Sequence, residues 1–190
     1  MAKNGQRADL VIHPLPRQER GAILEILSQC GNFTGEELSI AQELIDTWLD
    51  KPGQGDYTAL SALLGGAVAG YVCFGPTPAT QATWDLYWIA VAQGLQGSGI
   101  GKKLLQSAEV QIASRGGRTI VIETSSTEKY RPARGFYEKN GYALEARIRD
   151  FYRAGDHRLI YVKRMQAGGS DEKKENRRPH GKYRLPDRNS

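Results

Sequence analysis

The sequence is poor in the residues that bind metals and form disulfides, since its 190 residues include only three histidines and two cysteines. The histidines, His13, His157 and His180, are scattered along the chain and show no ligand spacing. We therefore expect no metal site. Cys73 lies within the apolar run AVAGYVCF, which predicts a buried thiol rather than a disulfide.

Long apolar segments are also missing. No run approaches the roughly 20 apolar residues that a membrane-spanning helix needs. The first ten residues, MAKNGQRADL, lack the apolar centre of a signal peptide. These absences predict no membrane partner and a cytoplasmic location. Apolar residues nevertheless form 39% of the chain, which is enough for a core, and the length favours one domain.

Positive charge is concentrated near the C-terminal end. Of the net charge of +5, residues 166–190 contribute +3, because they contain seven Lys or Arg and four Asp or Glu. This segment has few apolar residues and no periodicity, so we predict a domain over 1–165 followed by a disordered basic tail over 166–190. A solvated tail is the simpler interpretation, and we expect no nucleic-acid partner. The positive charge still leaves contact with nucleic acid or another anionic partner open.

The spacing of apolar residues predicts alternating helices and strands. Thr34 and Glu37 form a Ser/Thr-x-x-Glu capping box at the start of one helix. Gly65 and Gly66 predict a hairpin turn between two strands. Strands are predicted over 9–15, 56–64, 67–75, 83–91, 119–125, 142–152 and 157–165, and helices over 16–29, 34–50, 99–115 and 131–140. This order predicts an α+β fold, a mixed α/β arrangement around one sheet.

The segment LQGSGIGKKLL, Leu95 to Leu105, places three glycines where an apolar-periodic helix begins. Glycine costs roughly 1 kcal/mol per helix position relative to alanine, so a bare backbone must serve a purpose there. Ser98 is the predicted N-cap. Unpaired N–H groups and the positive end of the helix dipole make such a turn a phosphate site, to which Lys102 adds positive charge. A tight turn without a ligand is the alternative interpretation.

Two common phosphate motifs do not fit this segment. G-x-G-x-x-G fails because residue 102 is lysine, and the P-loop pattern fails at residues 96 and 103. The remaining pattern, Gln96-Gly97-Ser98-Gly99-Ile100-Gly101, fits Gln/Arg-x-x-Gly-x-Gly. It resembles the acetyl-coenzyme A pyrophosphate loop of the GNAT superfamily of N-acetyltransferases. The downstream segment ARGFYEKNGY, residues 133–142, resembles the second signature of that family.

The resemblance is close over residues 84–142 and architectural over about 8–165. It implies a central, twisted, mostly antiparallel sheet of about seven strands flanked by about four helices. It also implies acetyl-coenzyme A as the acyl donor, without a metal. The implied cofactor-binding residues are the backbone of Ile89, Ala90 and Val91, the loop residues Gln96, Gly97, Ser98, Gly99, Ile100 and Gly101, the adjacent Lys102, and Tyr130, which stands where many members have asparagine.

Acetyl transfer from a thioester to an amine needs a general acid for the leaving thiolate. By resemblance, Tyr137 takes that role, since a phenol with a reference pKa near 10 suits it. A core aromatic residue beside Phe136 is the alternative interpretation of Tyr137. The motif match favours the catalytic interpretation.

Two acids within apolar strands are candidates for the general base, Asp85 and Glu123. Either could take the amine proton directly or through water. Either could instead bind a cationic amine, or pair with an arginine such as Arg147 or Arg149. The residues alone leave these alternatives open.

The acceptor pocket is predicted from one face of the strand over 83–91. Strand alternation would place Asp85, Tyr87, Ile89 and Val91 on that face. We expect Phe33, Tyr87 and the final hairpin, RIRDFYRAGDHR, to line the pocket. The charges of this hairpin are mixed in sign, so the charge of the acceptor cannot be inferred from them.

These observations predict a cytoplasmic GNAT-type enzyme that transfers an acetyl group from acetyl-coenzyme A to a primary amine. Transfer is expected to be direct, in a ternary complex, because the two cysteines do not suggest a covalent acyl-enzyme. The partner is a small-molecule or peptide amine, and a homodimer is compatible with the sequence. The alternatives are a different acyl-coenzyme A donor on the same scaffold and a regulatory module that binds acyl-coenzyme A without turnover.

Overall fold

The computed structural model describes residues 9–31, 33–51 and 53–165. The predicted basic tail, 166–190, and the first eight residues of the predicted domain lie outside the described residues. Among the residues that are described, no helix has both the length and the apolar character needed to cross a membrane.

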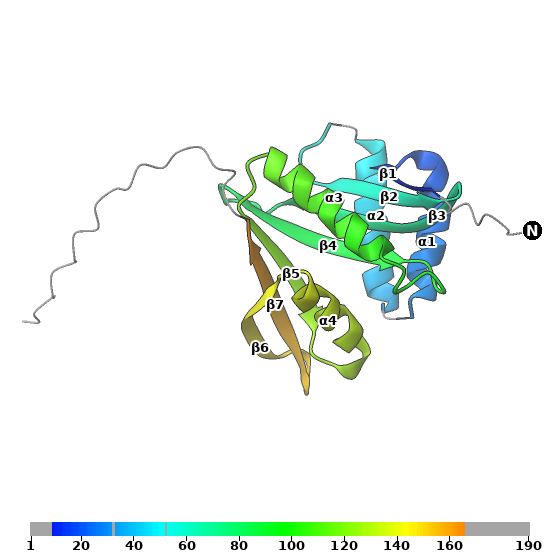
Figure 1. Ribbon diagram of the computed structural model, residues 1–190. Coiled ribbons are helices and arrows are strands. Elements are labelled where there is room, and N and C mark those ends of the chain that lie inside the picture. The colour runs from blue at the N-terminus through cyan, green and yellow to red at the C-terminus, as the bar shows by residue number, and fades with distance from the viewer. Residues whose placement is uncertain (1–8, 32, 52, 166–190) are drawn as a thin grey trace, which may run out of the picture.

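One seven-stranded sheet organises the described chain, in the order β1-β2-β3-β4-β5-β7-β6 (Figure 1). β4 and β5 run parallel, and every other neighbouring pair is antiparallel. The predicted mixed, mostly antiparallel sheet is therefore confirmed. The strands are β1 (Leu10–Pro14), β2 (Thr58–Leu64), β3 (Ala67–Pro76), β4 (Thr83–Val91), β5 (Thr119–Ser125), β6 (Ala143–Arg153) and β7 (Asp156–Arg164).

Four α-helices of the described chain cover the two faces of this sheet. They are α1 (Arg20–Gln29), α2 (Gly35–Asp50), α3 (Ile100–Ser114) and α4 (Arg131–Lys139), and short 3-10 turns, η1 (Arg17–Glu19) and η2 (Glu128–Tyr130), precede α1 and α4. Figure 1 shows α1 and α2 on one face and α3 on the other. Ile23 and Ile45 of the first pair pack with Tyr71 and Cys73 in one core cluster. The apolar stripe of α3 packs with α4 in a second cluster, so the sheet separates two cores.

The sequence patterns that define the helices appear as predicted. The five apolar positions of α3, residues 100, 104, 105, 108 and 112, are all buried. Thr34 accepts a hydrogen bond from the N–H of Glu37, whose carboxylate accepts one from the N–H of Thr34. This capping box fixes Glu37 at the start of α2. Cys73 is a free, buried thiol, as its apolar run predicts.

β4 and β5 separate soon after they meet. Their pairing covers only Thr83–Asp85 against Thr119–Val121. Beyond these residues β4 continues beside β3, while β5 continues beside β7. Since no strand bridges the two, the sheet opens between them toward the carboxyl end of β4.

A β-bulge in β4 corrects the predicted alternation. Cys73 of β3 lies opposite Trp88 and the next residue, Phe74, lies opposite Leu86, which leaves Tyr87 as the extra residue. An extra residue interrupts the strict alternation of side chains. Tyr87 consequently packs with the α1–α2 core, whereas Ile89 and Val91 pack with the α3 core. Tyr87 therefore does not share a face with Ile89 and Val91, contrary to the prediction.

Candidate active site

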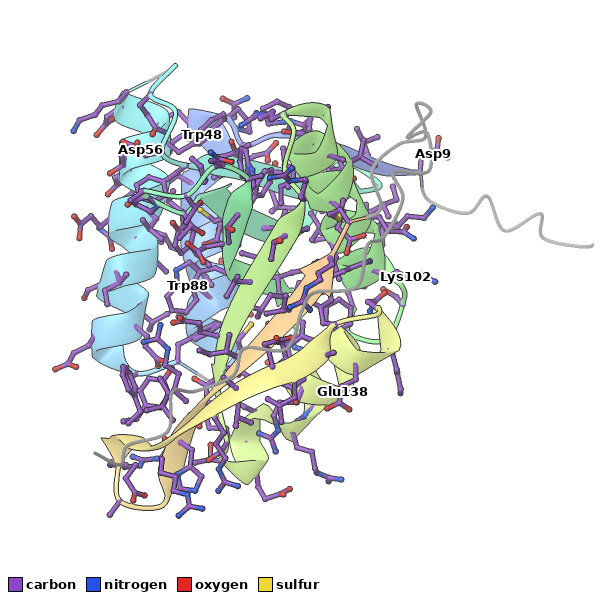
Figure 2. All side chains as sticks on the ribbon, turned by 90° about the vertical axis from the view of Figure 1, so that its left-hand side faces the viewer. Asp9, Trp48, Asp56, Trp88, Lys102 and Glu138 are labelled. Atoms are coloured by element: carbon purple, nitrogen blue, oxygen red, sulfur yellow. The ribbon has the colours of Figure 1, made fainter. Side chains whose placement is uncertain are left out.

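The glycine segment forms a tight turn into α3. Gly97 and Gly99 have φ of +79° and +93°, left-handed values that side chains disfavour. The first hydrogen bond of the helix joins the N–H of Lys103 to the carbonyl of Gly99 at 3.1 Å. The N–H groups of residues 100–102 precede that bond and have no acceptor within the helix. Such groups at the positive end of the helix dipole are suited to an anion, and Lys102 extends outward beside them (Figure 2).

The predicted N-cap is wrong. Gly99 occupies the N-cap position of α3, and no side chain caps the helix there. The Ser98 hydroxyl instead donates to the carbonyl of Leu95 at 2.5 Å and closes the preceding turn. Because Gly99, with its left-handed backbone, takes the N-cap position, Ser98 lies one residue before the position from which a side chain could cap α3. The N–H groups at the helix start thus stay available to a ligand.

The turn packs onto the end of β4. The side-chain amide nitrogen of Gln96 lies 3.5 Å from the backbone carbonyl oxygen of Val91. A Cβ on Gly101 would lie 3.5 Å from the Val91 side chain and 3.6 Å from the ring of Phe136 in α4. The structure therefore brings together the predicted cofactor residues of the strand end, 89–91, and those of the loop, 96–102.

A cavity of about 830 Å³ occupies the opening between β4 and β5. Leu86–Ile89 of β4 and Glu123–Ser125 of β5 form its sides. Phe33, which precedes α2, and Glu37, in its first turn, line it from one face of the sheet, and Tyr137 of α4 lines it from the other. The cavity thus reaches both faces of the sheet. A smaller depression of about 390 Å³ on the outer side of α2 contains none of the predicted site residues.

Tyr137 lies in the wall of the cavity on the α4 face. Its ring packs against Phe136, Tyr142 and Tyr161, with centroids 5.6, 6.2 and 6.1 Å away. Within the described residues no hydrogen bond to its hydroxyl is formed. Burial raises the pKa of Tyr137 to about 12, because a phenolate would lose its hydration. Tyr137 therefore keeps its proton at neutral pH.

The two candidate bases, Asp85 and Glu123, lie on the opposite face from Tyr137. Their strand neighbours Trp84, Leu86 and Ile122 pack into the α3 core, so alternation directs both acids to the α2 face. Asp85 accepts a hydrogen bond from the Thr77 hydroxyl at 2.7 Å. In the described part of the chain it forms no ion pair.

Glu123 forms an ion pair with Arg158 of β7. Pairing with an arginine was one of the alternatives for this acid, but neither of the arginines named as examples, Arg147 and Arg149, supplies it. Both belong to β6, which is separated from β5 by β7. Arg158 lies on the strand directly hydrogen-bonded to β5, where it stands opposite Ser125. The charge of Glu123 is therefore compensated within the fold, unlike that of Asp85.

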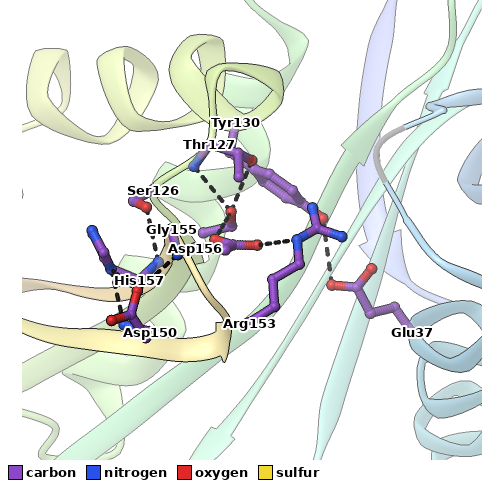
Figure 3. A network of polar contacts seen from close by, with 10 residues as sticks. Glu37, Ser126, Thr127, Tyr130, Asp150, Arg153, Gly155, Asp156 and His157 are labelled. Carbon is purple, nitrogen blue, oxygen red and sulfur yellow. Dashed lines mark hydrogen bonds and ion pairs between the residues drawn. The ribbon is translucent and has the colours of Figure 1, made fainter.

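Tyr130 links the two sides of the cavity. Its hydroxyl donates to the Glu37 carboxylate at 3.4 Å, which connects η2 to the start of α2 (Figure 3). Burial, and then the charge of Glu37, raise the pKa of Tyr130. Tyr130 was predicted to contact the cofactor, and its hydroxyl is directed toward α2. Phe33 packs edge-on against Trp88 at 4.9 Å, and both line the cavity, as does Tyr87.

Sequence reasoning missed several residues of the cavity. Asp156 is a buried carboxylate that accepts a hydrogen bond from the Ser125 hydroxyl at 2.5 Å and lies 3.7 Å from Arg153 (Figure 3). In the sequence it belongs to a hairpin turn, which gave no sign of burial. The sequence indicates Glu37 only as a capping residue and Trp88 only as a strand residue. Each carries a local signal, but none that indicates a cavity.

The described residues contain no cluster of three or more His, Cys, Asp and Glu side chains able to hold a metal ion. No curated protein sequence matches the chain. Residues 21–142 match the family model described as the acetyltransferase (GNAT) family. The family model and the fold support an acyltransferase. The chain belongs to the GNAT family of acetyltransferases.

Solved structures share this fold. A protein from Desulfovibrio desulfuricans assigned to the acetyltransferases of the GNAT family is 40% identical, with a TM-score of 0.79, over 82% of this chain and 99% of the other. An aminoglycoside 6'-N-acetyltransferase complexed with coenzyme A is 18% identical, with a TM-score of 0.64, over 81% and 96%. The ribosomal-protein-S18-alanine N-acetyltransferase from Escherichia coli is 19% identical, with a TM-score of 0.67, over 87% and 99%.

Proposed function

We propose that this protein transfers an acetyl group from acetyl-coenzyme A to a primary amine, directly and within a ternary complex. One observation carries the proposal: the cavity between β4 and β5 reaches both faces of the sheet. Two substrates can therefore enter from opposite sides and meet within it. Holding two reactants together in this way removes much of the entropic cost of their reaction.

The donor side fits a coenzyme A thioester. Residues 97, 99 and 101 carry no side chain, and the adjacent N–H groups of residues 100–102 can receive the pyrophosphate. The strand end at Ile89, Ala90 and Val91 can bind the pantetheine arm through backbone groups. The bound thioester supplies an activated acetyl group. The β-bulge beside Tyr87 disrupts the ladder, which frees backbone N–H groups to stabilise an oxyanion.

Proton transfers are assigned to the two ends of the cavity. On the α2 face, Asp85 takes the proton that the amine loses as its nitrogen forms a bond with the acetyl carbon. On the α4 face, Tyr137 gives its proton to the sulfur as the carbon–sulfur bond breaks, and later regains one from solvent. The burial that keeps Tyr137 neutral also disfavours a free thiolate. The sulfur therefore needs a proton as the bond breaks, and the phenolate left on Tyr137 must be reprotonated from solvent.

The test is to incubate the protein with acetyl-coenzyme A and a panel of primary amines. The proposal predicts free thiol and acetylated amine in a one-to-one ratio, measured by thiol release and product mass. Propionyl-coenzyme A in a parallel assay tests the choice of acyl group. Binding of acetyl-coenzyme A without any turnover across the panel would contradict the proposal and favour a regulatory module.

A further inference from the structure

The acceptor side of the cavity is mostly aromatic. Its α2-face walls carry the side chains of Phe33, Tyr87, Trp88, Tyr130 and Tyr152. Figure 2 shows Trp88 on the side of the sheet covered by α2. The edge-on packing of Phe33 against Trp88 fixes one wall. Aromatic walls of this kind bind apolar bodies and the faces of other rings.

Apolar surface of these walls is left open to water. Ile40 of α2 is 52% exposed and Tyr152 of β6 is 48% exposed, and both line the cavity. Exposed apolar patches that border a pocket are typical of binding sites. A ligand with an apolar body would cover these side chains, whereas a heavily hydroxylated one would not.

Three carboxylates of the cavity already have partners within the fold. Glu123 forms an ion pair with Arg158. Asp156 accepts a hydrogen bond from the Ser125 hydroxyl and lies near Arg153. Glu37 accepts hydrogen bonds from the N–H of Thr34 and the hydroxyl of Tyr130, and it lies in the first turn of α2, where the positive end of the helix dipole stabilises its charge.

Two lining carboxylates remain, Asp85 and Glu36. Glu36 lies on the exposed first turn of α2, while Asp85 is half-buried and bonded only to a hydroxyl in the described chain. A polycation would need a free carboxylate for each of its ammonium groups to offset their desolvation. Of the two, only Asp85 is half-buried, so the cavity offers a single carboxylate away from bulk water for an ammonium group.

We infer that the acceptor is an arylalkylamine, a single primary amine carried on an apolar body of about the size of one aromatic ring. This inference rests on the proposed function. The amine end faces Asp85, and the ring lies between the Phe33–Trp88 wall and the Tyr130–Tyr152 wall. The cavity of about 830 Å³ must also hold the thioester end of the donor, which limits the acceptor to a small molecule.

The experiment compares kcat/KM for 2-phenylethylamine, ethylamine, spermidine, kanamycin and a short peptide with an N-terminal alanine. Ethylamine is the matched control, because it has the same amine without the ring. We expect 2-phenylethylamine to exceed ethylamine by about 50-fold, the gain from burying one ring, and to exceed the polycations by at least as much. Equal rates with ethylamine, or a preference for spermidine, kanamycin or the peptide, would overturn the inference while leaving the proposed function intact.

A pair of variants locates the preference in the cavity. Phe33→Leu should reduce the ratio of kcat/KM for 2-phenylethylamine over ethylamine by about tenfold. Val110→Ala shortens an exposed apolar side chain of α3 outside the cavity lining and should keep the ratio within about twofold. Calorimetric binding of coenzyme A confirms that both variants are folded. An unchanged ratio in Phe33→Leu would overturn the placement of the ring, whereas no acetylation of any amine by the parent protein would contradict the proposed function itself.

Discussion

Asp85 and Tyr137 line the same cavity from opposite faces of one sheet. The arrangement exists because the parallel pairing of β4 with β5 ends at Asp85 and Val121. A carboxylate able to accept a proton is thereby separated from a phenol able to donate one. Asp85 can therefore accept a proton from the incoming amine, and Tyr137 can donate one to the departing sulfur, without a direct proton transfer between the two side chains.

Asp85→Asn should lower kcat by about 10²-fold, because it removes the carboxylate that takes the amine proton. Activity should recover in part as the pH rises, since the fraction of neutral amine increases. Glu123→Gln should cost less than about tenfold, because Arg158 already compensates that charge. Rates measured across pH decide between the acids, and the reverse order of losses would assign the base to Glu123.

Tyr137→Phe should lower kcat by about 10²–10⁴-fold, the usual range for loss of a general acid. The ring remains, so packing and the affinity for acetyl-coenzyme A should persist. Because burial raises the pKa of Tyr137 to about 12, the parent rate should show no loss from this group up to pH 10. Turnover within twofold of the parent would make Tyr137 a packing residue.

The same raised pKa has a consequence for stability. A buried phenol contributes stability that is complete below its unfolded pKa of about 10 and is lost as pH rises toward 12. Tyr137→Phe should therefore reduce the sensitivity of the fold to alkali between pH 10 and 12. Circular dichroism during alkaline titration of both proteins measures this difference, and superimposable curves would show that Tyr137 is not buried in solution.

Ser98→Asp should weaken coenzyme A binding at least tenfold relative to Ser98→Asn. The two variants have nearly the same shape, and both remove the hydroxyl bonded to Leu95. Only the aspartate places a negative charge beside the proposed pyrophosphate position, where repulsion at a few ångströms is worth more than the 1.4 kcal/mol of a tenfold change. Calorimetry with coenzyme A measures both affinities, and equal values would remove the loop from the binding site.

Lys163→Met should lower the free energy of unfolding by about 2 kcal/mol. Lys163 bonds both oxygens of Glu109 at 2.9 Å and the carbonyl of Asn140 at 3.0 Å, which joins β7 to α3 and to the end of α4. The next residue, Arg164, is 67% exposed in its pair with Glu145. Arg164→Met should cost less than about 1 kcal/mol. Urea unfolding of both variants compares them, and equal losses would show that the Lys163 pair has no special role.

Local patterns predicted much of the fold. The apolar stripe of α3 and the Thr34–Glu37 capping box could be predicted from the sequence, because each depends on residues three or four positions apart. The bulge at Tyr87 was not, because an extra residue in a strand leaves the local apolar pattern almost unchanged. Strict alternation then placed Ile89 and Val91 on the wrong face.

The site depends on contacts between distant parts of the chain. Tyr130 and Glu37 are 93 residues apart, and Arg158 reaches Glu123 because β7 lies between β5 and β6. Sequence could name the acids and the phenol, but not which acid is neutralised. That distinction depends on strand order, which is set by packing across the sheet.

Direct transfer in a ternary complex is tested most directly by initial rates measured while acetyl-coenzyme A and the best amine of the panel are varied together. If both substrates must occupy the cavity at once, double-reciprocal plots at several fixed amine concentrations will intersect. Parallel lines, with acetyl retained on the protein after the donor is removed, would contradict the account, because they require a covalent acetyl-enzyme.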